Sequence, residues 1–487
     1  MASPILSRHN WLAGTLELSS KVRLGLTSRG VPRFRFVPYD KRFPSLAVGC
    51  SERNLFYNVH AIVEPSADGR SGTLIQSLGR PTQATEETVL LTTYAFDSKK
   101  ELRQPPLPLS LTASLENHIP LDGVTFAIDP EGCRDVDDSV TFQKMHIGYR
   151  VAINIADVAA WIPPGSSLDR SAAQRATSFY SLHGVALSPM FHRAFSEEKA
   201  SLLSDGNTRP TLSLLCEWTP GMKPTGLQFA ETLTAVTVSY TYEQASQRFL
   251  EGHKPLHLLQ QFVEDIGTKT PNPHIWIERL MLFYNTEVGK ILQQNKSGIL
   301  RRGAGPLQER EEQLQDLLER YPDLERTLFS SAEFCSASES ETQHKGLGVD
   351  AYAYASSPLR RYVDLVNQRI LKAILNSTDV PSVDQTLIDE MNRRAKQAKA
   401  FSRDLFSFTH LARPVELEPL SIPAIATLHN SEKNRLEVWV PVWNRSVKVR
   451  LPPGTEVPSK GTPLALRWYS DPGQARWKDK VVFQISC

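Results

Sequence analysis

Four aspartates within ten residues form the sequence feature that most restricts how this chain can fold. They are Asp129, Asp135, Asp137 and Asp138, in the segment 124–142. The stretches 124–128 and 139–142 are rich in β-branched and aromatic residues and predict two short strands, while Asp129-Pro130 with Gly132 predicts the turn between them. Carboxylates this close repel each other unless a cation lies between them, and hard divalent cations such as Mg²⁺ prefer oxygen ligands. A solvated acidic loop is the alternative interpretation of this segment.

The overall composition is that of an ordinary globular protein. The chain has 487 residues, 40% of them hydrophobic, and a formal net charge of +2, so bulk charge gives no signal for a nucleic-acid partner. Its five cysteines are scattered without a C-x-x-C pair, which excludes a zinc ribbon and fits a reducing compartment. No apolar run approaches the roughly 18 residues of a membrane span. We therefore expect a soluble, cytoplasmic protein that does not associate with membranes.

Residues 1–100 are expected to form a small β-barrel that binds RNA. Six short alternating runs predict its strands, at 14–18, 21–26, 34–37, 58–63, 72–78 and 88–92. The stretch 33–44 interleaves basic with aromatic residues, a pattern typical of barrels that stack bases and follow phosphates. A strand with a solvated basic edge explains the same pattern. Residues 101–121 are rich in proline and serine, and they predict a linker.

Residues 122–415 are expected to form one large mixed domain. Predicted strands follow the acidic segment at 151–162, 212–218 and 231–241, and predicted helices cover 167–178, 273–294, 307–320, 324–334, 359–375 and 384–411. In the last helix, four basic residues share one face, namely Arg393, Lys396, Lys399 and Arg403. That face either meets phosphate or is simply solvated.

Residues 416–487 return to a β pattern. Five predicted strands, at 424–428, 435–440, 445–451, 463–468 and 481–485, fit a second small barrel of the OB type. The expected fold is therefore an α+β multidomain protein. It has an N-terminal OB or cold-shock-like barrel, a central mixed α/β domain and a C-terminal S1 or OB-like barrel.

Six motifs in the central domain appear in an order that points to one family. They lie at 126–140, 154–169, 175–180 with 189–190, 277–285 with 299–302, 334–335 with 344–352, and 357–364. Together they resemble the RNB nucleases, the superfamily of RNase II, RNase R and the exosome catalytic subunit. Residues 36–44 and 77–80 are similar to the second cold-shock barrel of the eukaryotic exosome nuclease. The C-terminal barrel has the position and size of the family's S1 domain.

This resemblance implies a processive 3′→5′ exoribonuclease that hydrolyses single-stranded RNA to nucleoside 5′-monophosphates by a two-metal mechanism. It implies that the four aspartates are the ligands of Mg²⁺, with Mn²⁺ as a substitute, and that Arg360 stabilises the charge of the transition state. It also implies that Tyr180 holds the 3′-terminal nucleotide, with Arg361 and Arg302 as further RNA-binding residues. A core role for Tyr180 and a structural ion pair for Arg361 are the alternatives. His344 is expected to be structural.

The chain also departs from the family pattern. Asn154 and Gln368 stand where relatives often have histidine, and residues 242–276 are too short for us to identify a second base-stacking aromatic. Only one N-terminal barrel is predicted, without the tethering domain of the eukaryotic relative, so we do not expect docking to the exosome. We also expect a monomer.

Two other functions are compatible with parts of the sequence. The first is an inactive RNA-binding scaffold with the same fold. The second is a phosphatase, because Asp135-Val-Asp137 resembles the motif of the haloacid-dehalogenase enzymes. That motif follows a hydrophobic strand directly, whereas Gly-Cys-Arg precedes Asp135 in this chain.

Overall fold

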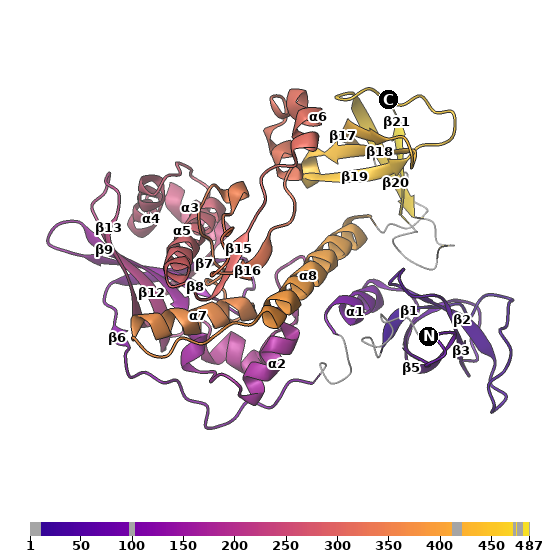
Figure 1. Ribbon diagram of the computed structural model, residues 1–487, viewed down its shortest axis with the longest axis horizontal. Coiled ribbons are helices and arrows are strands. Elements are labelled where there is room, and N and C mark those ends of the chain that lie inside the picture. The colour runs from indigo at the N-terminus through magenta and orange to yellow at the C-terminus, as the bar shows by residue number, and fades with distance from the viewer. Residues whose placement is uncertain (1–10, 97–102, 412–420, 471–473, 475–480, 487) are drawn as a thin grey trace. The chain divides into compact units, whose positions relative to one another are not determined.

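The computed structural model describes residues 11–96, 103–411, 421–470, 474 and 481–486 (Figure 1). Contacts group the chain into two compact units. One unit comprises Met1–Leu102, Ala304–Ser331 and Lys399–Cys487, and the other comprises Arg103–Gly303 and Ala332–Ala398. The predicted fold class is confirmed: a five-stranded closed barrel lies at the N-terminal end, a mixed domain in the middle and a five-stranded curled sheet at the C-terminal end.

The N-terminal barrel closes in the strand order β1-β2-β3-β5-β4. Its strands are β1 (Leu12–Leu16), β2 (Arg33–Pro38), β3 (Leu46–Gly49), β4 (Val59–Pro65) and β5 (Ser71–Gly79). Glycine at position 14 lets β1 approach β2, since an added Cβ would lie 2.2 Å from the Val37 carbonyl oxygen. The core of the barrel is built from Leu16, Phe34, Phe36 and their buried neighbours.

Two of the predicted strands in this region are wrong, and one strand was missed. Residues 88–92 belong to helix α1 (Gln83–Tyr94), because Thr82 forms a capping box with Thr85 that fixes the helix start against the β-branched composition. Residues 21–26 form only an isolated bridge from Leu26 to Pro32. Strand β3 was not predicted.

The C-terminal sheet has the order β19-β18-β17-β20-β21. All five predicted strands are present, as β17 (Ser421–Asn430), β18 (Arg435–Val440), β19 (Arg445–Arg450), β20 (Pro463–Ser470) and β21 (Val481–Ser486). Helix α6 (Gln308–Leu318) and the 3-10 helix η4 (Pro322–Thr327) pack against this sheet. The apolar contacts join Leu314, Leu317, Leu324 and Leu328 to Ile425 and Trp439.

The predicted helix over 324–334 is largely wrong. Proline begins η4, which is short, and the chain then enters strand β16 (Glu333–Ser336), paired with β15 (Ile299–Arg302). Helix α8 (Gln385–Leu411) matches its prediction closely, and the boundary between the two units falls inside it. In its second half, buried Asp404 accepts a hydrogen bond from Tyr39 of the first barrel at 3.0 Å.

A seven-stranded sheet of order β14-β7-β8-β9-β12-β13-β6 forms the centre of the second unit (Figure 1). Its strands are β6 (Ile119–Pro120), β7 (Val124–Asp129), β8 (Asp138–Lys144), β9 (Tyr149–Ala156), β12 (Thr208–Trp218), β13 (Thr225–Ala235) and β14 (Val238–Thr241). The strand predicted over 151–162 ends at Ala156, where Asp157 caps the 3-10 helix η2 (Val158–Ala160). The strand predicted over 231–241 is two strands.

The two faces of this sheet differ in chemistry. One face is apolar and packs against helix α4 (Lys254–Asp265), where Phe262 meets Phe142 and Trp218 edge to face. The other carries buried hydroxyls, and Asn154 lies at their centre, donating to Thr141 at 2.9 Å and accepting from Ser213 at 2.7 Å. These hydrogen bonds satisfy the buried amide.

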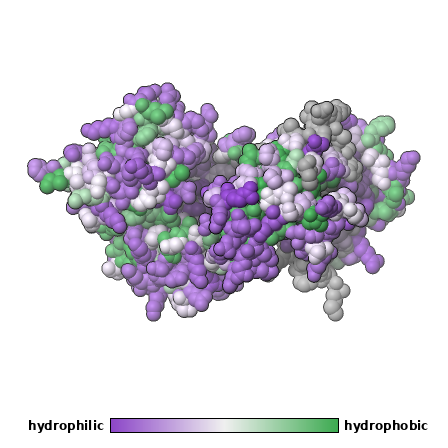
Figure 2. Space-filling view, turned by 90° about the horizontal axis from the view of Figure 1, so that it is seen from above, coloured by the Kyte–Doolittle hydropathy of each residue, from purple (hydrophilic) through white to green (hydrophobic). Residues whose placement is uncertain are grey.

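The other helices of the second unit differ in how well they were predicted. Helices α2 (Ser167–Arg175), α5 (Pro273–Gln294) and α7 (Tyr362–Leu375) were predicted, whereas α3 (Tyr242–Leu250) and α4 were not. None of the helices in the described residues is long and apolar enough to cross a membrane. Hydrophilic residues cover most of the face seen in Figure 2, with apolar residues in small separate groups.

Candidate active site

The acidic segment forms a fixed corner at the end of two neighbouring strands. Strand β7 ends at Asp129 and β8 begins at Asp138, as the flanking composition predicted. Gly132 supports the turn with a φ of +78°, which favours glycine. The backbone of Asp137 is held by the Ala156 amide, which donates to its carbonyl at 2.8 Å. The four aspartates therefore occupy defined positions and are not a free loop.

A second pair of segments meets this corner from far along the chain. The residues after α2 run beside those before α7, with Ser178 donating to the Arg360 carbonyl at 2.9 Å and Tyr362 donating to the Ala176 carbonyl at 2.8 Å. Ala176 ends α2 with a positive φ of 60°, which turns the chain toward Tyr180. This backbone pairing places Tyr180 and Arg360 on the same side of the site.

Asp137 links the acidic corner to the turn that carries Arg360. Its carboxylate is 3% exposed and accepts from the Leu359 amide at 2.9 Å and from Arg360 Nε at 2.8 Å. Arg360 Nη2 also donates to Ser357 Oγ at 2.9 Å. The Arg360 side chain nevertheless keeps 42% of its surface exposed, so the guanidinium is oriented and still open to a ligand.

Burial and crowding raise the proton affinity of the carboxylates. Burial, together with the neighbouring charge of Asp135, raises the pKa of Asp137 to about 7, although Arg360 opposes this rise. Burial and the neighbouring carboxylates also raise the pKa of Asp129 and of Asp138. The corner thus holds negative charge at a cost that a bound cation would relieve.

A cavity of about 730 Å³ opens over the corner and collects most of the predicted residues. All four aspartates line it, together with Tyr180, Arg360 and Arg361. The Tyr180 hydroxyl donates to Asp135, and burial followed by the charge of Asp135 raises the pKa of this phenol. The volume is in the range of small-molecule and nucleotide pockets.

Several lining residues were not predicted from the sequence. Tyr242 begins α3, and its ring stacks on His274 with centroids 3.6 Å apart and an interplanar angle of 18°. Glu278 and Arg279 reach the cavity from α5. The motif at 277–285 marked that helix, but no feature of the sequence showed which of its faces meets the cavity. The Cys133 thiol lies 3.9 Å from Asp135.

The other predicted residues have structural partners. Arg361 forms an ion pair with Asp364 at 2.7 Å and lies over the Tyr354 ring at 4.0 Å, while it also lines the cavity. Arg302 does not line the cavity; it pairs with Glu333 at 2.9 Å and Glu339 at 2.6 Å. Burial lowers the pKa of His344, and its backbone pairs with Gly303, which is consistent with a structural role.

Comparison with known proteins identifies relatives of this chain. A model of the RNB domain matches residues 121–260 and 253–377. The exosome complex exonuclease RRP44 homolog A of Arabidopsis thaliana is 24% identical over 81% of this chain and 52% of its own length. The chain spans about half the length of the curated relatives it matches.

Two solved structures share the fold. RNase R of Mycoplasma genitalium, in complex with ribose-methylated single-stranded RNA, aligns with a TM-score of 0.76 and 14% identity, covering 98% of this chain and 90% of that one. Yeast Ssd1, described as a pseudonuclease, aligns with a TM-score of 0.69 and 17% identity, covering 91% and 65% respectively. At these identities the likeness establishes the fold alone.

Proposed function

The chain belongs to the RNB family, and we propose that it is a 3′→5′ exoribonuclease that degrades single-stranded RNA. One observation carries this proposal. Four aspartates, an oriented but accessible arginine and a tyrosine converge on one cavity, although Arg360 lies 223 positions after Asp137 in the chain. Phosphodiester hydrolysis requires charge neutralisation, stabilisation of the developing negative charge and a fixed substrate. The aspartates would hold the cations that neutralise charge, the arginine would stabilise the developing charge, and the tyrosine would hold the substrate.

The acidic corner fits a divalent cation. Asp138 has no side-chain hydrogen bond or ion pair among the residues that the structure describes, and the raised pKa of Asp137 indicates charge that lacks full compensation. Asp129, Asp135, Asp137 and Asp138 would hold Mg²⁺, with Mn²⁺ as a substitute, since both are oxygen-seeking ions. Bound there, two such ions supply an activated water and stabilise the leaving oxygen.

Arg360 and Tyr180 position the RNA in this proposal. The exposed part of the Arg360 guanidinium binds phosphate oxygens, while its contact with Asp137 keeps it aimed at the acidic corner. The Tyr180 ring stacks on the terminal base, and its hydroxyl contact with Asp135 holds the ring beside the carboxylates. Stacking is independent of sequence, so the enzyme would accept all four bases.

The finer features of the activity are also proposals. They are processive action, release of nucleoside 5′-monophosphates and a two-metal mechanism, all of which the motif resemblance implies. The proposed domains are a barrel at 1–100, a linker at 101–121, the catalytic domain at 122–415 and a barrel at 416–487. Both barrels would bind RNA through basic and aromatic residues, with strong salt dependence.

An RNA-binding scaffold without catalysis is the second candidate. The likeness to the yeast pseudonuclease favours it, because the same fold exists there with that description. The complete set of carboxylates and the accessible guanidinium favour catalysis.

Product analysis separates the two candidates. Single-stranded RNA labelled at its 3′-terminal phosphodiester is incubated with the protein and Mg²⁺, and the products are resolved by thin-layer chromatography. The exonuclease releases labelled nucleoside 5′-monophosphate first, while a matched single-stranded DNA stays intact. Binding without any released label would refute the enzyme and support the scaffold.

A further inference from the structure

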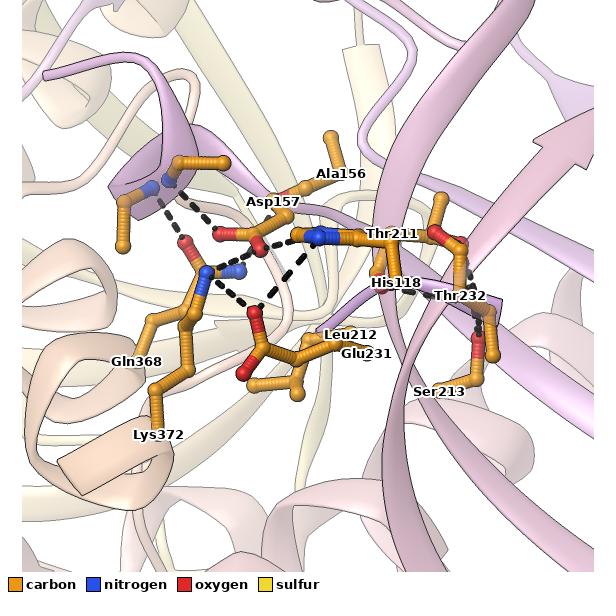
Figure 3. A network of polar contacts seen from close by, with 12 residues as sticks. His118, Ala156, Asp157, Thr211, Leu212, Ser213, Glu231, Thr232, Gln368 and Lys372 are labelled. Carbon is orange, nitrogen blue, oxygen red and sulfur yellow. Dashed lines mark hydrogen bonds and ion pairs between the residues drawn. The ribbon is translucent and has the colours of Figure 1, made fainter. Parts of the chain in front are cut away.

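A buried ionic group lies in the second unit, apart from the cavity that the four aspartates line (Figure 3). It comprises His118 before β6, Asp157 after β9, Glu231 on β13 and Lys372 on α7. The side chains of His118 and Asp157 are fully buried, Glu231 is 6% exposed and Lys372 is 15% exposed. The activity proposed above assigns no role to these residues.

Three members of this group have the composition of a metal site, but Lys372 fills the position of the cation. Its ammonium contacts Asp157 and lies 2.8 Å from Glu231 Oε2, and Figure 3 shows it pointing between the two carboxylates. Burial disfavours this charge, yet the adjacent Asp157 raises the pKa of Lys372 above its ordinary value. A divalent ion at the same place would meet a fixed positive charge.

The group combines two carboxylates with one ammonium and one imidazole. Two carboxylates and one ammonium leave one negative charge. His118 Nε2 lies 3.0 Å from Asp157 Oδ2, whereas Nδ1 lies 3.6 Å from Glu231 Oε2 and has no hydrogen-bond partner among the described residues. A buried charged set persists only when it is paired in this way.

The ionic group is connected to the acidic corner through Gln368, one turn before Lys372 on α7. Gln368 Nε2 donates to the Ala156 carbonyl at 2.9 Å, and its Oε1 accepts from the Ala159 amide at 3.0 Å. The Ala156 amide in turn donates to the Asp137 carbonyl at 2.8 Å. Because α7 begins directly after Arg360–Arg361, these contacts close a ring that returns to Asp137 through Arg360.

We propose that a positioning network keeps Arg360 within hydrogen-bond distance of Asp137. The network consists of His118, Asp157, Glu231, Lys372 and Gln368. The inference rests on the proposed ribonuclease function. Lys372 and Gln368 fix α7 against the end of β9. Arg360 lies just before the start of α7, and Ala156 at the end of β9 supports Asp137. His118 ties the segment before β6 to this network through its contact with Asp157, so the packing of that segment also helps to position Arg360.

Lys372→Met tests this network, because methionine keeps most of the length of the side chain and removes its charge. The expected result is a fall of at least tenfold in kcat with KM and RNA affinity within twofold of wild type. Hydrogen exchange of the Leu359 amide, which donates to Asp137, is expected to accelerate at least tenfold. Lys372→Met should also lower the stability of the protein, because it leaves two buried carboxylates without their cation. The double variant Lys372→Met with Glu231→Gln removes one charge of each sign and should recover most of that loss.

Gln368→Met is the milder variant and is measured whether or not Lys372→Met folds. It removes the two hydrogen bonds to Ala156 and Ala159, and the same separation of kcat from KM is expected. Lys290→Met is the matched control, since Lys290 forms an exposed helical pair with Glu287 on α5. This control should leave kcat and the exchange of Leu359 unchanged.

Three results would overturn the proposal. The first is wild-type kcat and wild-type Leu359 exchange in Gln368→Met. The second is a double variant no more stable than Lys372→Met alone. The third is a transition metal bound stoichiometrically to purified wild type and lost in Glu231→Gln, which would make the group a metal site. If wild type lacks ribonuclease activity, the proposed function fails, whereas the exchange of Leu359 still tests the network.

Discussion

Replacing Asp137 by asparagine should stabilise the metal-free protein at alkaline pH while abolishing hydrolysis. Asp137 is almost fully buried, and burial with the charge of Asp135 raises its pKa from 3.8 to about 7. The folded state therefore binds this proton more tightly than the unfolded state does. Stability from this group is fully present below about pH 4 and is lost as the pH rises toward 7. Asparagine has no proton to lose, so the variant escapes that loss.

The magnitude follows from the two pKa values. A rise from 3.8 to about 7, at about 1.36 kcal/mol per pH unit, corresponds to about 4 kcal/mol of lost stability at pH 8. Because asparagine resembles the protonated carboxyl in shape and charge, Asp137→Asn should approach this gain at pH 8. At pH 4 the same variant should differ from wild type by less than about 1 kcal/mol.

Denaturant unfolding in EDTA at pH 4 and pH 8, followed by fluorescence of the buried Trp218 and Trp276, measures this difference. Asp157→Asn is the matched control with the opposite sign. Burial alone would raise the pKa of Asp157, but hydrogen bonds from His118 and Lys372 outweigh it and lower the pKa. That variant should lose about 3–5 kcal/mol at pH 8. An Asp137→Asn protein no more stable than wild type at pH 8 would show that burial of the Asp137 carboxylate does not destabilise the folded state.

Three further outcomes are expected. Mg²⁺ should raise the thermal midpoint more at pH 8 than at pH 5, because protons compete for the carboxylates at the lower pH; equal shifts would contradict the metal-binding role of the corner. Arg360→Lys should lower kcat about 10²-fold in single-turnover assays while RNA affinity changes little, since lysine cannot reproduce the planar fork. Tyr180→Ala should weaken RNA binding by about 1–3 kcal/mol in fluorescence anisotropy, whereas Tyr180→Phe should retain it; equal losses would exclude stacking as the basis.

Local chemistry made much of the fold predictable. The acidic corner, helix α5 and the five C-terminal strands each have a clear period or turn signal, and each lies where it was expected. The strand predicted over 88–92 is wrong, because the capping box of Thr82 and Thr85 starts a helix that outweighs the β-branched composition. The strand predicted over 151–162 is too long, because apolar residues continue past Asp157, whose side chain accepts a hydrogen bond from the Ala160 amide and caps the next helix.

The candidate site was predictable only as a set of ordered motifs. The resemblance of those motifs to the RNB nucleases indicated the four carboxylates, Tyr180 and Arg360, which the structure brings together at one cavity. Tyr242 and Arg279 were missed, because which face of a helix meets a cavity is decided by tertiary packing. The group around His118 was missed for the same reason, since its four members are separated by up to 254 positions and no local pattern joins them.

Hydrolysis of RNA at the acidic cavity can be measured directly. Single-stranded RNA labelled at its 5′ end is followed over time on a sequencing gel with wild type and Asp137→Asn, in Mg²⁺ and in EDTA. We expect progressive shortening from the 3′ end by wild type in Mg²⁺ and not in EDTA, with the variant binding the RNA but leaving it intact. Intact RNA after incubation with wild type in Mg²⁺ or Mn²⁺, or equal cleavage by the variant, would contradict it.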